Sequence, residues 1–262
     1  MRKPILTLTT DFGVSDHYVG TMKGVILGIC PQAQIVDISH DVKPYEIAEG
    51  AYLIAQAYPH FPKKTVHVVV VDPGVGTSRR PILVEAAGQI FIGPDNGVLS
   101  MVYTREKHKI RLISNSRYFH KPVSQTFHGR DIFSPSAAHV AAGVPPARMG
   151  KLIQDYLRPA FDKPFHTGKR TWTGRILRID RFGNIVTNFR ASDYGDLGTR
   201  TFALSIGPRQ ICVLARSYAE CGAGEVFAIV GSSGYLEISV NQGSAAKAVG
   251  CETGAPVELS VW

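Results

Sequence analysis

The chain of 262 residues contains 44% hydrophobic and 19% charged residues, so it is long enough for two modest domains and shows no bias toward disorder. Its net charge of +8 permits contact with nucleic acid, but the basic residues are scattered apart from short pairs such as Lys63-Lys64 and Arg79-Arg80. We therefore expect no nucleic-acid partner. No stretch reaches the ~18 apolar residues of a membrane span, so we expect no membrane partner either.

The cysteines and the first residues predict a reduced, cytoplasmic protein. None of the four cysteines belongs to a C-x-x-C pair, which disfavours a zinc ribbon or a redox motif. The first segment, MRKPILTLTTDFG, is typical of a strand rather than a signal peptide because threonines and Asp11 interrupt its apolar run.

Strand and helix signals alternate through residues 1–160, which predicts a layered α/β domain with a largely parallel sheet. Apolar residues at helical spacing predict helices at Asp16–Cys30, with Asp16 as N-cap, and at Pro44–Tyr58 and Ser134–Ala142. The unbroken apolar run Thr65–Asp72 is typical of a parallel strand covered on both faces. The other expected strands are Ile5–Thr10, Gln34–Ser39, Ile82–Glu85, Gln89–Gly93 and Ile110–Ser114.

The composition changes at Leu157–Gly174, where proline, glycine and charged residues predict a linker between domains. Strand signals separated by glycines follow and predict a second domain, a small β-barrel or sandwich over residues 170–262. The expected strands are Arg175–Asp180, Asn184–Phe189, Thr201–Ile206, Gln210–Ala215, Val226–Val230, Tyr235–Val240 and Pro256–Trp262.

Four polar clusters follow strands of the first half: TTDFGVSDHYVG, VDPGVGTSRR, FIGPDNGVLS and TFHGRDIFSPSAAH. Ligands of open α/β sheets bind beyond the carboxyl ends of the strands, so Asp11 and Asp72 are expected to share one crevice. Simpler interpretations compete, since Asp11 can end its strand in an Asx-turn and the Asp95-Asn96-Gly97 segment favours a turn. We expect Arg80 to point to solvent and His139 to be packed.

Several enzyme classes lose support from the same segments. The glycine pair in VDPGVGTSRR lacks the third glycine of a dinucleotide fingerprint, and no G-K-[ST] follows it. No G-x-S-x-G elbow is present. A metal site built from Asp11, Asp72, His40 and His128 is conceivable, but no ligand spacing is diagnostic.

The second half contains two polar segments, DRFGNIVTN and VGSSGYLEISVNQGSAA. Asn184 follows a glycine in a predicted turn, and Asn188 ends the strand after it. An asparagine amide offers both donor and acceptor, so it can bind the ammonium or carboxylate of a ligand. A structural role in a hairpin turn is about equally expected.

Six segments together resemble one family, the S-adenosyl-L-methionine (SAM) hydroxide adenosyltransferases, which are SAM hydrolases related to the SAM-dependent fluorinase and chlorinase. The segments are TTDFG-x-x-D-x-Y-V-G, VDPGVGT-x-R, GPDNG, FHGRD-x-F-x-P-x-A-A-H, FGN-x-x-T-N and GYLEI-x-x-N-x-G-x-A-A. The resemblance covers nearly the whole chain. It implies an N-terminal α/β domain, a C-terminal β-barrel, and a homotrimer that binds SAM between the N-terminal domain of one subunit and the C-terminal domain of its neighbour.

The resemblance also implies a catalytic trio of Asp72, Arg79 and His128 that activates water. The fluorinase has tyrosine at the positions of Asp72 and His128, and a serine associated with halide binding at the position of Gly129. This chain therefore resembles the hydroxide-using branch of the superfamily.

Binding roles follow from the same resemblance. Asp11 would hold the ribose hydroxyls, and Tyr45 would pack against the sugar or the sulfonium, since a cation near an aromatic face is favourable. The segment Asn241–Ala246 would offer backbone groups to adenine. Asn184 and Ser232 would contact the methionine moiety.

The implied reaction is hydrolysis of SAM to adenosine and L-methionine by nucleophilic substitution at ribose C5′. Water is the weak reactant, and a carboxylate, an imidazole and a guanidinium can position it and relieve it of a proton. No metal or redox cofactor is implied. Two alternatives stay open, a SAM or adenosine sensor and a metal-dependent hydrolase.

Overall fold

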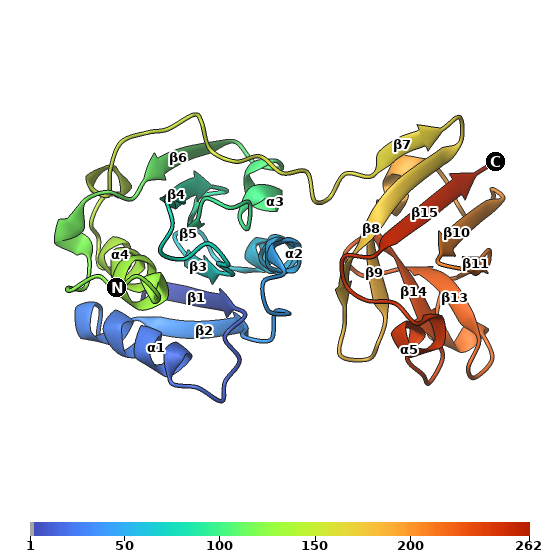
Figure 1. Cartoon of the computed structure of the whole chain (residues 1–262), viewed down its shortest axis with the longest axis horizontal. Helices are drawn as coiled ribbons and strands as arrows, with labels where there is room; N and C mark the ends of the chain where they lie inside the picture. The colour runs from blue at the N-terminus through green and yellow to red at the C-terminus, as the bar shows by residue number, and fades with distance from the viewer. Residues whose placement is uncertain (1–2) are drawn as a thin grey trace. The chain divides into compact units, whose positions relative to one another are not determined.

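The computed structural model describes residues 3–262. The chain divides between Pro159 and Ala160 into two compact units. The first unit contains a six-stranded sheet in the order β2-β1-β3-β5-β4-β6 (Figure 1). The first four strands of this order run parallel, and β4 and β6 add antiparallel pairs, so the predicted α/β class is confirmed. The strands are β1 (Ile5–Thr10), β2 (Gln34–Ser39), β3 (Val66–Val70), β4 (Pro81–Ala86), β5 (Gln89–Pro94) and β6 (His108–Leu112).

Helices cover both faces of this sheet. The valines at the end of β3 point alternately to the two faces, and each set packs in a core with helices. Val68 and Val70 join the core formed with α1 (Tyr18–Ile29) and α4 (Ser134–Ala141). Val69 and Val71 join the core formed with α2 (Ile47–Ala57) and α3 (Ser100–Tyr103). Single helical turns occur at Tyr58–His60, Ser116–Tyr118, Gly129–Phe133 and Pro146–Arg148.

Helix α1 begins later than the sequence indicates. Its N-cap is His17, not Asp16, and no side chain caps the first turn. Among residues 3–262, no helix has both the length and the apolar character needed to cross a bilayer.

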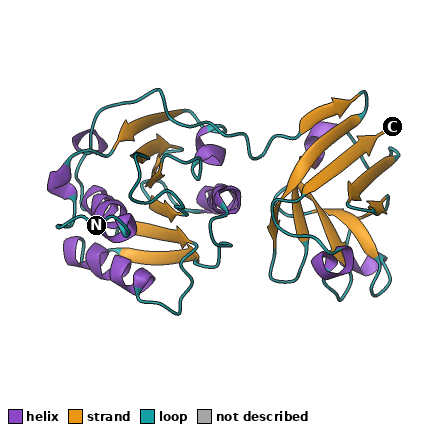
Figure 2. Ribbon diagram, viewed as in Figure 1, coloured by secondary structure: helices purple, strands orange, loops and turns teal. Residues whose placement is uncertain are grey.

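The second unit is a nine-stranded, almost entirely antiparallel sheet in which β11 also contacts β13, so the sheet curls on itself (Figure 2). Its core holds apolar side chains from the strands and from α5 (Ala245–Val249). Helix α5 and β7 are not foreseen by the sequence patterns, and the predicted strand Gln210–Ala215 is two short strands. The strands are β7 (Phe165–Gly168), β8 (Thr171–Ile179), β9 (Ile185–Arg190), β10 (Phe202–Ile206), β11 (Arg209–Ile211), β12 (Leu214–Ala215), β13 (Val226–Val230), β14 (Tyr235–Val240) and β15 (Pro256–Val261); 3-10 turns lie at Ala191–Tyr194 and Tyr218–Glu220.

Candidate active site

The order in which strands are added to the sheet reverses at β1, which has β2 on one side and β3 on the other. Such a switch point opens a crevice beyond the carboxyl ends of the two adjacent strands. Asp11 directly follows β1, and Asp72 follows β3 two residues after Val70, which pairs with Thr10. Burial raises the pKa of the Asp11 carboxyl above its ordinary value, and the negative charge of Asp72 raises it further, while the backbone N–H of Tyr45 opposes the shift. The two carboxylates therefore face a common space.

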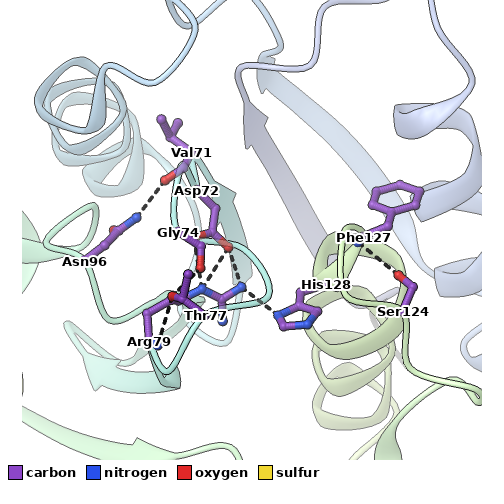
Figure 3. Close-up of polar contacts among 9 residues, drawn as sticks. All are labelled: Val71, Asp72, Gly74, Thr77, Arg79, Asn96, Ser124, Phe127 and His128. Carbon is purple, nitrogen blue, oxygen red and sulfur yellow. Dashed lines mark hydrogen bonds and ion pairs between the residues drawn. The ribbon is translucent and has the colours of Figure 1, made fainter.

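A tight turn folds Arg79 back onto Asp72 (Figure 3). The Thr77 hydroxyl donates to the Gly74 carbonyl at 2.7 Å and accepts from the Arg79 backbone N–H at 3.3 Å. Arg79 Nε then lies 3.0 and 2.9 Å from the two Asp72 carboxylate oxygens, and Nη2 donates to one of them. Gly76 has φ +78°, and a side chain there would collide with the Gln125 carbonyl. The glycines thus permit the tight turn, and the turn brings Arg79 within hydrogen-bond distance of Asp72.

The Asp72–Arg79 pair is shielded from water. The side chains of Asp72 and Arg79 are 4% and 9% exposed, and Phe133 lies beneath the guanidinium, 5.2 Å from ring centroid to carbon. Arg79 Nη1 is buried without a hydrogen-bond partner among the described residues. A paired but partly unsatisfied guanidinium in a crevice retains donor capacity for a ligand.

His128 completes the trio through its Nδ1 atom, which lies 2.8 Å from Arg79 Nη2. A guanidinium can only donate, so Nδ1 must be the acceptor and the proton of the neutral imidazole resides on Nε2. Burial lowers the pKa of His128 below its ordinary value, and the charge of Arg79 lowers it further, against the opposing effects of Asp72 and Asp131. The imidazole is therefore neutral at neutral pH, and a hydrogen bond to the Ser124 backbone also opposes the shift.

The FHGRD segment positions His128 by means of a buried carboxylate. Asp131 is fully buried and accepts hydrogen bonds from the Ser124 backbone at 2.8 Å and from Arg130 Nε at 2.6 Å. Burial alone would raise the pKa of Asp131, but these hydrogen bonds outweigh it and hold the pKa below its ordinary range. Ser124 also accepts from the Phe127 backbone at 3.0 Å. Asp131 and Arg130 thus brace the loop rather than join the trio.

Asp11 is held by an unusual backbone conformation at Tyr45. The Tyr45 N–H donates to Asp11 Oδ2 at 3.0 Å, and Tyr45 has φ +70°, a left-handed conformation that is uncommon for residues other than glycine. The Tyr45 side chain is 72% exposed. His40 stabilises the same loop, since its Nδ1 lies 2.8 Å from the Thr10 hydroxyl and its carbonyl accepts from the Gly13 N–H at 2.8 Å.

The metal site considered from the sequence, built from Asp11, Asp72, His40 and His128, does not form among the described residues. The second ring nitrogen of His40 lies 3.1 Å from Asp37 Oδ1, so both nitrogens face protein groups. Within residues 3–262, no group of three or more His, Cys, Asp or Glu side chains is placed to hold a metal ion.

Arg80 does not point to solvent as expected. It lies 2.7 Å from Asp95 and 2.9 Å from Asp155, and Asp95 also accepts from the Leu157 backbone at 2.9 Å. The neighbouring Asn96 donates to the Val71 carbonyl at 2.8 Å and so braces the end of β3. The GPDNG segment is the expected turn, and its polar side chains serve the structure.

Asn184 and the segment from Asn241 to Ala246 lie at one end of the β9–β14 pair, and the turn that contains Ser232 precedes β14 at the other end. Asn184 is buried and donates from its backbone and its Nδ2 to Asp180, at 2.8 and 2.9 Å. The Ala246 N–H donates to the Gly183 carbonyl at 3.0 Å, which brings the segment from Asn241 to Ala246 beside this turn. Asn188 is structural, since it accepts from the Arg175 backbone at 2.8 Å.

Two carboxylates of this end of the sheet are absent from the sequence-based prediction. Burial raises the pKa of Glu237 above its ordinary value, and Asp180 raises it further. Glu237 lies against Gly231, the residue that precedes Ser232. A charged residue within the apolar strand YLEISV is the signal that indicates Glu237 from sequence.

The fold and the trio define a two-unit α/β protein with an Asp–Arg–His cluster beyond the carboxyl end of β3 in its first sheet. Residues 6–150 match the sequence model of the SAM hydroxide adenosyltransferase N-terminal domain, and residues 174–258 match that of the C-terminal domain. The chain belongs to the SAM hydroxide adenosyltransferase family.

Similar proteins agree with this membership. The chain is 35% identical to an (R)-S-adenosyl-L-methionine hydrolase of Thermus thermophilus over 98% of its own length and 99% of that protein. It is 37% identical to a protein of the same name from Methanocaldococcus jannaschii, over 93% and 90%. A fluorinase of Nocardia brasiliensis is 28% identical over 99% and 98%. A solved structure of a conserved, uncharacterized protein from Thermotoga maritima superposes with a TM-score of 0.88 at 36% identity, covering 98% and 99%.

Proposed function

We propose that this chain hydrolyses SAM to adenosine and L-methionine, with water or hydroxide attacking ribose C5′. The observation that carries the proposal is the shielded Asp72–Arg79–His128 trio beyond β3. The names of the relatives in Thermus and Methanocaldococcus support the same reaction.

The trio suits a reaction in which only the nucleophile needs help. The C5′–S bond breaks, its electron pair neutralises the sulfonium, and methionine leaves as a thioether that needs no proton. The C5′–O bond forms from water, which loses one proton to a nearby acceptor. Asp72 retains carboxylate lone pairs that Arg79 does not use, so it is the proposed acceptor, and His128, which accepts from Arg79, is the proposed group that positions the water beside it. Holding the water in line with the C5′–S bond supplies the rest of the acceleration.

Binding roles are assigned to residues around the two clusters. Asp11 would accept hydrogen bonds from the ribose hydroxyls, with Tyr45 beside the sugar. Asn184 and Ser232 would contact the methionine moiety, and the nearby acids Asp180 and Glu237 favour its ammonium group. The backbone of the segment from Asn241 to Ala246 would contact adenine. No metal or redox cofactor takes part in the proposed reaction.

The test is incubation with SAM in ¹⁸O-labelled water, followed by chromatography and mass analysis of the products. The proposal requires adenosine with the label on its 5′-oxygen, over many turnovers and undiminished by a chelator. A single adenosine per chain would favour the sensor, and loss of activity in chelator would favour a metal-dependent hydrolase. Unlabelled adenosine, or methylthioadenosine as the main product, would exclude attack by water at C5′.

Halide should not replace water as the nucleophile. A Cβ atom at Gly129 would lie 3.2 Å from Met22 sulfur, 3.2 Å from the Phe127 ring and 3.5 Å from the Phe12 ring, so the surroundings are apolar and tight. Such a site cannot replace the hydration shell of a halide ion. We expect adenosine, and no comparable 5′-halo-adenosine, in high fluoride or chloride. Chromatography checks this, and a halogenated product exceeding adenosine would contradict it.

We further propose that three copies assemble and that each active site combines the first unit of one subunit with the second unit of its neighbour. Light scattering should then give three times the chain mass of 28.5 kDa. Co-expression of an inactive Asp72→Asn chain with an inactive Asn184→Ala chain should restore about a quarter of wild-type activity, because one half times one half of the shared sites are intact on both sides. No restoration in a verified mixed oligomer would place both halves of the site on one chain.

A further inference from the structure

A hollow lies at the end of the first sheet opposite the trio, where the parallel strands begin. Its volume is about 810 Å³, and it is lined by residues at the beginnings of β1, β3 and β5, by the turn before β3, and by the segment after α4. The trio lies beyond the other ends of the same strands, so a strand of six residues, ~20 Å, separates the two sites.

The lining combines an apolar wall with positive charge. Ile5, Val66, Ile90 and Val144 contribute to the wall. Three lysines also line the hollow, Lys3, Lys63 and Lys64, and none of the described residues that line it is acidic. The positive potential at its rim is therefore not neutralised locally.

A neighbouring hollow extends the positive region. It has a volume of about 650 Å³ and shares the residues 142–145 with the first. Arg117 and Arg148 line it, and none of the described residues that line it is acidic. The two arginines add positive charge on this side of the loop.

The backbone places one of these lysines, Lys64, in an uncommon conformation. Lys64 has φ +68°, where lysine is disfavoured relative to glycine or asparagine. Its N–H donates to the Gly88 carbonyl at 2.8 Å, and the stem of Lys63 packs over Gly88. Strained residues of this kind gather at ligand sites.

We propose that this hollow binds a small amphipathic anion, with an apolar body against the valine and isoleucine wall and one carboxylate or phosphate head at the lysines. The volume falls in the ~300–1,000 Å³ range of small-molecule sites, which are mostly apolar with a few polar groups. The lysines repel the cationic sulfonium of SAM, so the hollow is not a second site for the proposed substrate. The proposal is independent of the proposed reaction.

The test uses octanoate and octyl phosphate as probes, with 1-octanol and inorganic phosphate as matched halves of the ligand. Calorimetry on the full chain should show saturable binding of one or both octyl anions, and at least tenfold weaker binding of the alcohol and of phosphate alone. Methyl NMR should place the shifts at Ile5, Val66, Ile90 and Val144. Preference for one octyl anion identifies the head group.

A charge variant checks the lysines. Lys3→Gln, Lys63→Gln and Lys64→Asn combined should weaken octanoate binding about tenfold, with asparagine chosen because it tolerates the φ of residue 64. The control is Lys151→Gln, Lys169→Gln and Lys247→Gln, which removes the same charge outside the hollow and should bind like wild type.

The proposal is overturned by no saturable binding of either octyl anion, by equal affinity in the two charge variants, or by methyl shifts confined to other regions. Concentration-dependent broadening of the same methyl signals without ligand would assign the hollow to a second copy of the chain and would also overturn it. SAM turnover does not enter the readout, so failure here leaves the proposed reaction unaffected.

Discussion

Replacing Asp72 by asparagine should lower SAM turnover by ~10²–10⁴-fold, the usual loss when an acid–base group is removed. Asparagine keeps the shape and one acceptor oxygen for Arg79, but it lacks the charge that accepts the proton of water. SAM affinity should change much less because the lost interaction is made mainly in the transition state. Single-turnover rates and calorimetry separate the two quantities.

Asp95 offers a matched control for this substitution. Its side chain is 3% exposed and pairs with Arg80, as that of Asp72 is 4% exposed and pairs with Arg79. Asp95→Asn should lose less stability than Asp72→Asn, because Arg80 is 30% exposed and keeps Asp155 as a second carboxylate partner. Turnover of the folded Asp95→Asn protein should stay near that of wild type. Equal turnover of the two variants would mean that Asp72 serves the structure only.

Acid pH should lower the rate of SAM hydrolysis because His128 becomes protonated. Its pKa is depressed, so the imidazole stays neutral down to a pH below its ordinary 6.5. Protonation of Nδ1 would remove the acceptor that faces Arg79. The rate should be constant above that pH and fall as pH drops through the folded-state pKa. His128→Ala should have a much lower rate without this acidic limb.

The second large effect is a loss of stability in acid caused by His67, which is fully buried in β3. Its Nδ1 lies 2.7 Å from the Thr7 hydroxyl and its Nε2 3.1 Å from Gln89 Oε1, and its ring stacks on Phe91 at 4.8 Å between centroids. Burial lowers the pKa of His67 to about 4, although the Gln89 hydrogen bond opposes the shift. The folded state therefore favours the neutral ring.

The sign of the effect follows from linkage. Above pH 6.5 the ring is neutral in both states, so its contribution to stability is fully present there. As pH falls from 6.5 to about 4 only the unfolded state binds the proton, and the free energy of unfolding decreases by about 3 kcal/mol. This loss should be complete near the folded-state pKa.

Urea unfolding at a fixed chain concentration, at pH 7.5 and pH 4, measures this loss. His67→Gln should reduce the pH-dependent change by about 3 kcal/mol relative to wild type, while its stability at pH 7.5 also falls through lost packing. His166→Gln, at an exposed position, should leave the pH dependence as it is in wild type. Parallel pH curves for wild type and His67→Gln would contradict the prediction.

Local sequence patterns predicted the strands whose bounds depend on the local sequence alone. Strands β1, β13 and β14 have the predicted bounds because their apolar runs end at Asp11, Gly231 and Asn241. Strand β7 lies in a stretch with proline and glycine, is exposed throughout, and forms only by pairing with β8. No periodicity reports such an edge strand.

The same distinction applies to the site. Asp72 and Arg79 are seven residues apart, so their pairing is visible in one motif. His128 lies 49 residues beyond Arg79, and only the family resemblance connected them. Arg80 was predicted to face solvent because its partner Asp155 is 75 residues away. Side-chain partners across such separations depend on the fold, which residue patterns do not specify.

The contacts of Arg80 and Asp95 also decide where the first unit can be cut for expression alone. The family match ends at residue 150, yet Asp155 pairs with Arg80, and the Leu157 backbone bonds to Asp95 and to the hydroxyl of Tyr103. A fragment truncated at residue 150 would leave Asp95 and Arg80 short of partners and uncover the core that Ile153 and Tyr156 seal. A fragment that retains the chain through Pro159 keeps all of these contacts.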